Sequence, residues 1–161
     1  MTAPTQQRNP WVMLALFLGL VSVVALVGSL STMAAPEVYS QFEAPSWALP
    51  GAWFGPLWTV SYVVLALAGW AYWRTDGETQ GFALYGIGLL FNLLWAPLFF
   101  AGGSVRLACV DIVLLDFFVI MTVGLFYRRS RTAALLLLLY FGWLCYTTAL
   151  NIAIIALNDV R

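Results

Sequence analysis

Five long apolar segments constrain what this chain can fold into more than any other feature. Each has about the 20 residues that an α-helix needs to cross the hydrocarbon core of a bilayer. They cover residues 11–33, 53–73, 81–100, 107–127 and 132–157. Hydrophobic residues make up 63% of the 161 residues and charged residues only 9%, which is too apolar for a soluble domain of this size. The sequence predicts an all-α membrane protein, a single domain over residues 1–161 that forms a bundle of five transmembrane helices.

The arginines in the connections predict how the bundle lies in the membrane, because positively charged short loops stay in the cytoplasm. With five spans, the arginines on the N-terminal side are Arg8, Arg74, Arg128, Arg129 and Arg131. Those on the opposite side are Arg106 and Arg161. The excess predicts a cytoplasmic N-terminus. The first span is longer than the apolar part of a signal peptide, and we expect it to be retained.

The connection between the first two spans, residues 34–52, is much longer than the others. It has no Lys or Arg and contains Pro36, Pro45, Pro50, Tyr39, Phe42 and Trp47. Loops of this length are usually either functional or disordered, and three aromatic residues among prolines argue against disorder. We predict that residues 34–52, which we call the lid, pack over one end of the bundle.

Composition and motifs exclude several classes of function. The chain has no His, and its two cysteines, Cys109 and Cys145, lie in apolar segments without CxxC spacing, so we expect buried free thiols and no metal site. The net charge of zero gives no reason to expect a nucleic-acid partner. The GxSxG, Walker and HExxH motifs are absent. No internal repeat is evident, which weakens the case for an inverted-repeat transporter.

Asn92 lies in the middle of the uncharged third span, where an unpaired amide would cost several kcal/mol. Gly88 and Ala96 lie on the same helical face, and Trp95 is one turn away. Two interpretations fit this pattern. The small residues can allow close contact with another helix, or they can leave room for a ligand cavity in which Asn92 is a polar anchor.

Aromatic and polar residues also share helical faces in other spans. Trp58 and Tyr62 are four residues apart in the second span, and one face of the fifth span presents Trp143, Tyr146, Thr147 and Leu150. A Trp in a span can be an interfacial anchor, a core residue or part of a ligand site. Trp58 and Trp95 lie well inside their spans, which favours a role in lining a site. In the first span we predict a helix-packing seam, formed by Ser22, Ala25, Ser29 and Thr32.

Two acidic residues lie in the fourth span. Asp111 is about one turn inside it, where its carboxyl could reach water or headgroups. Asp116 is about 15 Å inside, close to the midplane of the bilayer. We predict that Asp116 is structural and hydrogen-bonded to a polar residue on a neighbouring helix. Their spacing of five residues places the two carboxyls on different sides of the helix, which excludes a catalytic pair.

Three segments of the chain carry extended motifs. Residues 44–62 read APSWALPGAWFGPLWTVSY, and residues 85–100 read YGIGLLFNLLWAPLFF. The fifth span adds Tyr140, Trp143, Thr148, Leu150, Asn151 and Asn158. In register, these segments resemble the signatures of the translocator protein family, which includes the tryptophan-rich sensory proteins and the peripheral benzodiazepine receptor. The chain is most similar to bacterial-type members.

The resemblance implies a five-helix protein of the bacterial cell membrane, often a homodimer, with a ligand cavity closed by the first loop. Family ligands are porphyrins, sterols and isoquinoline carboxamides, bound as ligands rather than as required cofactors. Trp58 and Asn92 resemble a pair that bonds a ligand carbonyl, and Trp143 resembles a cavity tryptophan. The resemblance thus favours the cavity interpretation of Asn92. The predicted ligand-binding residues are Trp47, Trp58, Tyr62, Asn92, Trp95, Trp143, Tyr146, Thr147 and Leu150.

The sequence departs from the family pattern at Leu49, Ala52 and Gly88, and Gly88 replaces a glutamine that would add a polar group to the pocket. The sterol motif that animal members carry after the fifth helix is absent. We therefore predict a membrane-bound binding protein or sensor for flat hydrophobic ligands, with porphyrins as the favoured ligands. Two alternatives stay open: light-dependent porphyrin degradation, with Trp58 and Trp143 as candidate catalytic residues, and transport of such ligands.

Overall fold

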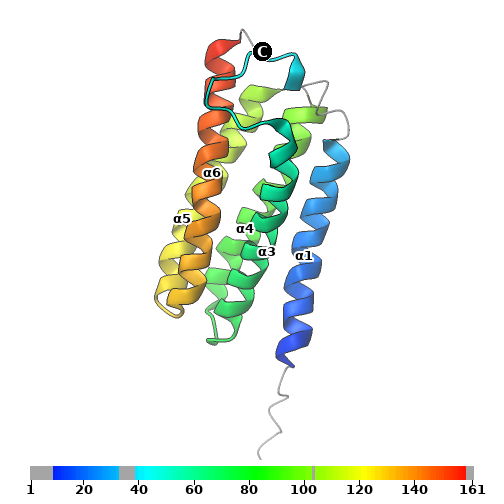
Figure 1. Cartoon of the computed structure of the whole chain (residues 1–161). Helices are drawn as coiled ribbons and strands as arrows, with labels where there is room; N and C mark the ends of the chain where they lie inside the picture. Colours follow the sequence, from blue (N-terminus) through cyan, green and yellow to red (C-terminus); the bar gives the residue numbers. More distant parts are fainter. Residues whose placement is uncertain (1–8, 33–38, 103, 159–161) are drawn as a thin grey trace, which may run out of the picture.

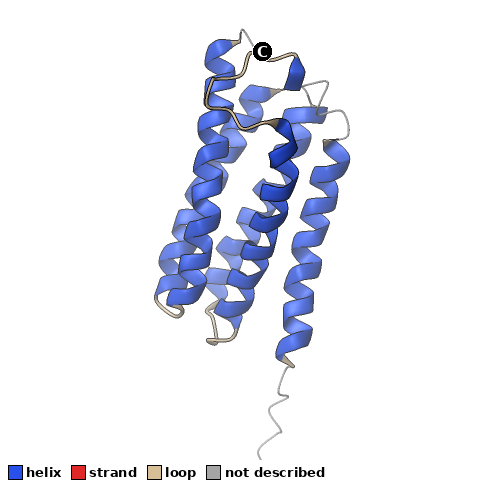
Figure 2. Cartoon of the chain, in the orientation of Figure 1, coloured by secondary structure: helices blue, strands red, loops and turns tan. Residues whose placement is uncertain are grey.

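Five long helices run side by side in the computed structural model, which describes residues 9–32, 39–102 and 104–158 (Figure 1). They are α1 (Pro10–Ser31), α3 (Phe54–Trp73), α4 (Thr79–Ala96), α5 (Val105–Tyr127) and α6 (Arg131–Leu157). The described residues contain no strand (Figure 2). All five helices, with their short extensions, are long and apolar enough to span a membrane. The predicted all-α bundle is confirmed, with helix bounds within a few residues of those expected.

Local signals explain where the helices begin and end. Asn9 caps α1 through its side chain, and Ser104 and Ser130 cap α5 and α6 by accepting hydrogen bonds from backbone N–H groups of the first turn. α4 ends at Ala96 because Pro97 has no N–H to continue the helical bonds. The chain then widens into a π-helical turn, Pro97–Ala101.

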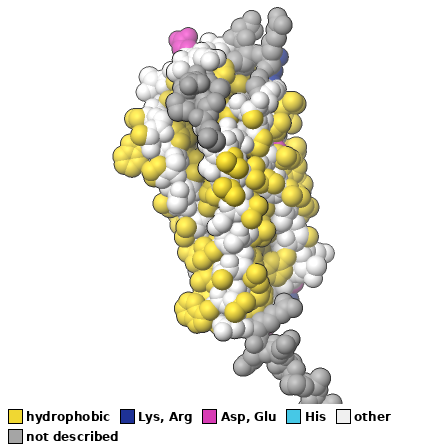
Figure 3. Space-filling view, turned by 90° about the vertical axis from the view of Figure 1, so that its right-hand side faces the viewer, with side chains coloured by type: hydrophobic (Ala, Val, Ile, Leu, Met, Phe, Trp, Pro, Cys, Tyr) yellow, Lys and Arg dark blue, Asp and Glu magenta, His cyan; other side chains and the backbone are white. Residues whose placement is uncertain are grey.

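The helices pack in a defined order. α1 contacts α3 and α4, α5 lies against α4 and α6, and α3 also contacts α6. Large hydrophobic side chains remain exposed on the outside of the bundle, and Figure 3 shows them spread along its length. This is the surface expected of a helix bundle in lipid, where an exposed leucine has no reason to be buried.

The end of the bundle away from the lid is tightly closed. The buried Tyr72 ring stacks on Phe126 with 3.8 Å between ring centroids. The Tyr72 hydroxyl accepts a hydrogen bond from the backbone N–H of Glu78, and the Glu78 carboxylate pairs with Arg129 at 2.6 Å. The α3–α4 connection is therefore fixed to the end of α5.

The lid packs over the opposite end of the bundle, at the top of Figure 1, as predicted for its described part, residues 39–52. The backbone N–H of Leu49 donates to the Tyr146 hydroxyl at 2.9 Å. Asn158 accepts a bond from the Glu43 N–H at 2.8 Å and donates to the Glu43 carbonyl at 2.9 Å. Both attachments end on α6 or its C-cap. Pro36 and its neighbours lie outside the described residues.

The cysteines and Asp111 differ from expectation. Cys109 and Cys145 are free thiols, but Cys109 is only half-buried and Cys145 is exposed, so the expectation that both are buried is wrong. An apolar thiol on a lipid-facing surface loses nothing by its exposure. Asp111 is 5% exposed, because it lies on the same side of α5 as the buried Ala108 and Leu115. The expectation that it reaches water or headgroups is therefore wrong.

The predicted structural hydrogen bond of Asp116 is confirmed. The Thr148 hydroxyl on α6 donates to the Asp116 carboxyl on α5 at 2.7 Å. Neither residue lines the large cavity described below. The bond therefore joins two neighbouring helices away from that cavity.

We expect Asp116→Asn to lower the thermal midpoint only slightly, because an amide oxygen can still accept from Thr148. Thr148→Val should lower the free energy of unfolding by about 1 kcal/mol, the usual net value of one hydrogen bond. Thermal unfolding in detergent measures both. Thr122→Val is the control, since the Thr122 hydroxyl bonds only within its own helix. If Asp116→Asn folded normally but lost ligand binding, the structural assignment would be wrong.

Candidate ligand cavity

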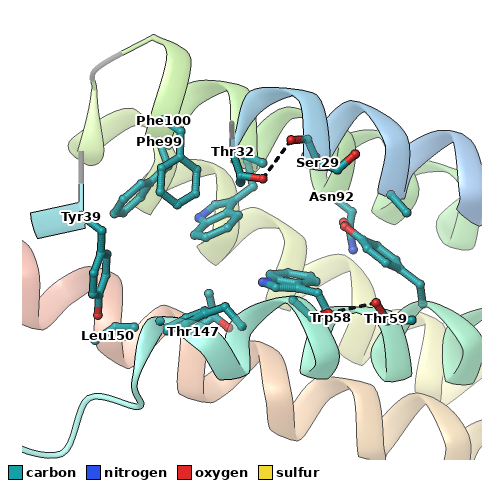
Figure 4. A pocket seen from close by; sticks show the side chains of 18 of the residues that line it. Ser29, Thr32, Tyr39, Trp58, Thr59, Asn92, Phe99, Phe100, Thr147 and Leu150 are labelled. Atoms are coloured by element: carbon teal, nitrogen blue, oxygen red, sulfur yellow. Dashed lines mark hydrogen bonds between the residues drawn. The ribbon is translucent and has the colours of Figure 1, made fainter. Parts of the chain in front are cut away.

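A cavity of about 880 Å³ lies beneath the lid. Its walls come from α1, α3, α4 with its π-helical extension, and α6, together with Tyr39, Gly51 and Ala52 of the lid. In Figure 4, Tyr39 and Leu150 lie toward one end of this space and Asn92 toward the other, with Trp58 between them. No charged residue is present among the described residues of the wall. The cavity is therefore suited to an apolar ligand with few polar groups.

Aromatic rings form the middle of the wall. Trp58 of α3 and Trp95 of α4 lie with their ring centroids 5.6 Å apart and their planes 32° from parallel. On α3, Tyr62 lies one turn beyond Trp58, at 5.5 Å. The spacing of four residues places both rings on the same face of the helix. The Trp58 ring thus lies next to both the Trp95 indole and the Tyr62 phenol ring.

A polar cluster closes the deep end of the cavity. The Asn92 amide nitrogen donates to the hydroxyl of Tyr140, which is buried on α6. The Asn92 amide oxygen accepts from the Tyr62 hydroxyl at 3.3 Å. Asn92 also lines the cavity. Asn92 therefore bridges three helices, as the helix-contact interpretation predicts, and it also borders the cavity. Its role as a ligand anchor stays a prediction.

The predicted packing seam of α1 is instead part of the cavity wall. All four of its residues line the cavity: Ser22, Ala25, Ser29 and Thr32. α1 is buried in the bundle through Val21 and Val24. The hydroxyls of Ser22 and Ser29 are satisfied by carbonyls of their own helix, so they need no neighbouring helix. The packing prediction is wrong for this stripe.

Comparisons with known proteins agree with this architecture. The TspO/MBR family matches residues 15–157. A tryptophan-rich protein TspO from Chlorobaculum tepidum is 36% identical over 150 residues, which cover 90% of this chain and 95% of that protein. The chain belongs to the TspO/MBR family. A tryptophan-rich sensory protein from Cereibacter sphaeroides is 30% identical, with 92% of each chain covered, and the translocator protein of Homo sapiens is 31% identical, with 70% of each covered.

In this TspO/MBR family member, most of the predicted site residues come together on the cavity wall. These are Trp58, Tyr62, Asn92, Trp95, Thr147 and Leu150. Their role in ligand binding remains a prediction. Within each of α3, α4 and α6, the predicted residues are three or four positions apart and therefore share one face of the helix. These three faces line the cavity.

Three predicted residues are not on the wall: Trp47, Trp143 and Tyr146. Trp143 packs edge-on against Trp58 at 5.9 Å and stacks on Tyr146 at 5.3 Å. Phe54 also contacts Trp143, so two wall residues of α3 lie against this tryptophan. Trp47 is half-exposed and packs on Tyr146. In this structure, these three residues support the wall and the lid.

Several other wall residues were not among those predicted, and they include Tyr39, Phe54, Phe99, Phe100, Asn151 and Ile154. Asn151 could have been found, because it follows Thr147 by four residues and shares its face. Tyr39 could not, since helical spacing says nothing about a loop. Gly88 does not line the cavity, because it faces Leu115 and Val119 on α5. The expected loss of a polar pocket group at Gly88 therefore has no counterpart in this wall.

Asn92→Ala should destabilise the fold, because it leaves the buried Tyr140 hydroxyl without its partner. We expect a loss of about 1–3 kcal/mol in the free energy of unfolding. In Tyr140→Phe the hydroxyl is removed as well, so the double variant should lose less than the sum of the single variants. Unfolding in detergent measures this cycle, with the exposed Tyr127→Phe as control. Strict additivity would contradict a direct bond between Asn92 and Tyr140.

Proposed function

We propose that this TspO/MBR family membrane protein binds flat hydrophobic molecules in the cavity beneath the lid, with porphyrins as the favoured ligands. The observation that carries the proposal is the pair of large indoles, Trp58 and Trp95, in an uncharged cavity of about 880 Å³. A planar aromatic ligand gains most from such faces, because ring contacts add to the burial of apolar area. The names of the relatives, translocator and sensory protein, are compatible with a role in binding small molecules.

A second candidate is light-dependent porphyrin degradation. Trp58 contacts both Trp95 and Trp143 with ring centroids within 6 Å, so a ligand on the wall would lie next to a connected group of indoles. In the net reaction the porphyrin would be oxidised by dioxygen, with both oxygen atoms added across one bond of the ring, and a neighbouring indole would pass an electron on and be returned to its starting state. We consider binding to be the principal function and any photochemistry to be slow. Transport has less support, since the described wall residues carry no charge and the sequence shows no evident internal repeat.

Spectral titration with protoporphyrin IX, first in darkness and then under light, tests this proposal. We expect a saturable shift of the porphyrin absorption band. Trp58→Phe should weaken binding by about tenfold or less, since a smaller aromatic face remains. Trp70→Phe is the matched control, because the Trp70 indole bonds to the Pro10 carbonyl and does not line the cavity.

Illumination separates the two candidates. If the protein only binds, porphyrin should bleach at the same rate in the wild type and in Trp58→Phe when both are saturated. A defined product that forms only with the wild type would favour degradation. Rapid turnover of porphyrin by the wild type in darkness would contradict binding as the principal function.

We further propose that the protein is a homodimer in the bacterial cell membrane with a cytoplasmic N-terminus. Reporter fusions test the orientation: fusions after Arg74 and after Arg129 should report the cytoplasm, and a fusion near Phe42 the opposite side. The fold places Arg74 and Arg129 at the same end of the bundle, since both follow helices that run away from the lid. A cytoplasmic signal from the fusion near Phe42 would reverse the orientation. Cross-linking in native membranes tests the dimer.

A further inference from the structure

A row of oxidisable aromatic rings runs without a break from the cavity to the surface of the lid. Trp58 borders the cavity (Figure 4) and packs against Trp143 with 5.9 Å between ring centroids. Trp143 stacks on Tyr146 at 5.3 Å, and Tyr146 contacts Trp47 of the lid at 5.8 Å. Trp47 is 49% exposed. These four residues, which we call the aromatic row, therefore connect the cavity wall with the outside of the protein.

The chemistry of the aromatic row sets it apart from the other ring contacts of the lid. Tryptophan and tyrosine can each give up one electron to a moderately strong oxidant, whereas phenylalanine cannot. The other described ring contacts of the lid both include phenylalanine: Tyr39 with Phe54, and Phe42 with Phe99. Among the described contacts between lid and bundle, the aromatic row is therefore the route in which every ring can be oxidised.

The Trp143 indole is suited to pass a positive charge on. An oxidised indole readily loses its N–H proton to an acceptor, and this loss traps the radical on the ring. The indole N–H can only donate, and that of Trp143 is buried without a hydrogen-bond partner among the described residues. With no acceptor in contact, an oxidised Trp143 keeps its proton and can take an electron from the next ring.

The lid holds the outer end of the aromatic row in place. The backbone N–H of Leu49, two residues after Trp47, donates to the Tyr146 hydroxyl at 2.9 Å. This bond attaches the lid to the same side chain on which the Trp47 ring packs. The contact between Trp47 and Tyr146 is therefore fixed when the lid is closed, and the row is then complete.

We propose that the aromatic row is an electron-transfer path that carries a positive charge from a photo-oxidised ligand in the cavity to Trp47 at the surface. The path rests on the proposed function, since the flat ligand in the cavity absorbs the light. The excited ligand gives one electron to dioxygen, which becomes superoxide, and the oxidised ligand takes an electron from Trp58. The charge then passes through Trp143 and across Tyr146 to Trp47. A soluble one-electron reductant returns the missing electron at Trp47.

This activity is distinct from porphyrin degradation. In degradation the ligand is consumed, whereas in the proposed path the ligand and all four rings return to their starting state. The net change is the transfer of one electron from the reductant to dioxygen. The aromatic row would thus drive a light-dependent oxidation at the surface of the lid and spare the bound ligand.

Spin trapping without dioxygen tests the path. Protein saturated with protoporphyrin IX is illuminated with a cobalt(III) ammine complex, which takes one electron from the excited porphyrin and leaves oxidised porphyrin in the cavity. A nitroso spin trap marks the ring that holds the radical, and peptide mass spectrometry locates the adduct. Trp53, one residue after the lid, is the matched control ring, because it is 57% exposed but contacts no aromatic ring among the described residues. We expect the wild-type adduct on Trp47 rather than on Trp53.

Two variants interrupt the path at different points. In Trp143→Phe the adduct on Trp47 should fall to the level of Trp53, because phenylalanine does not carry the charge. Titration in darkness verifies that this variant still binds the porphyrin. Trp47→Phe is the second variant and changes only an exposed ring of the lid. Ascorbate should quench the radical quickly in the wild type and several-fold more slowly in Trp47→Phe, since the remaining rings are less accessible.

Several results would overturn the path. These are equal labelling of Trp47 and Trp53 in the wild type, unchanged labelling of Trp47 in Trp143→Phe, and the absence of any ring radical although the porphyrin is oxidised. If Trp143→Phe does not fold, the ascorbate comparison decides. Equal quenching in the wild type and in Trp47→Phe would then overturn the path.

The path and the proposed function can fail separately. If protoporphyrin IX does not bind in darkness, the proposed function fails. The path is then tested with a flavin photo-oxidant attached to Thr59→Cys, a wall position next to Trp58, in a chain whose two native cysteines are replaced by alanine. An adduct on Trp47 that disappears in Trp143→Phe would support the path without the porphyrin. No adduct on Trp47, or one that Trp143→Phe leaves unchanged, would overturn it.

Discussion

The hydrogen bonds of Asn92 are the interaction on which the rest of the structure depends. In lipid there is no water to satisfy an amide in the middle of a helix, so the partner must come from the protein. Asn92 on α4 finds Tyr140 on α6 and Tyr62 on α3, and these bonds fix three helices at the deep end of the cavity. The position of the cavity follows from this fixed point.

The five spans could be predicted from the sequence because span length and apolar composition are enough to define a transmembrane helix. The faces of those helices were harder to assign. In a soluble protein the apolar side of a helix marks the core, but in lipid both the inside and the outside of the bundle are apolar. The errors at Cys145 and at the Ser22–Thr32 stripe have this cause. Asp116 was predictable, because a carboxyl at that depth needs a partner wherever it points.

The cavity itself could be predicted only in part. Helical spacing brought Trp58 together with Tyr62, and Thr147 with Leu150, because residues four apart or three apart share a face. It could not show that Phe54 and Trp58 would lie against Trp143, since that depends on how α3 and α6 pack. Nor could it show where the lid attaches. Those contacts join residues about 100 positions apart, as in the bond from Leu49 to Tyr146.

The lid and the cavity are coupled through α6. The lid bonds described above end on Tyr146 and Asn158, and the wall residues Thr147, Leu150 and Asn151 lie between these two points on the same helix. Breaking three such bonds at about 1 kcal/mol each would leave the lid open in less than about 1% of molecules. The α1 side of the cavity is different, because Ser22 and Ser29 are both wall residues and exposed on the surface. The hydroxyls of Ser22 and Ser29 bond within α1, so this side of the cavity takes no part in the hydrogen bonds that hold the lid or in those of Asn92.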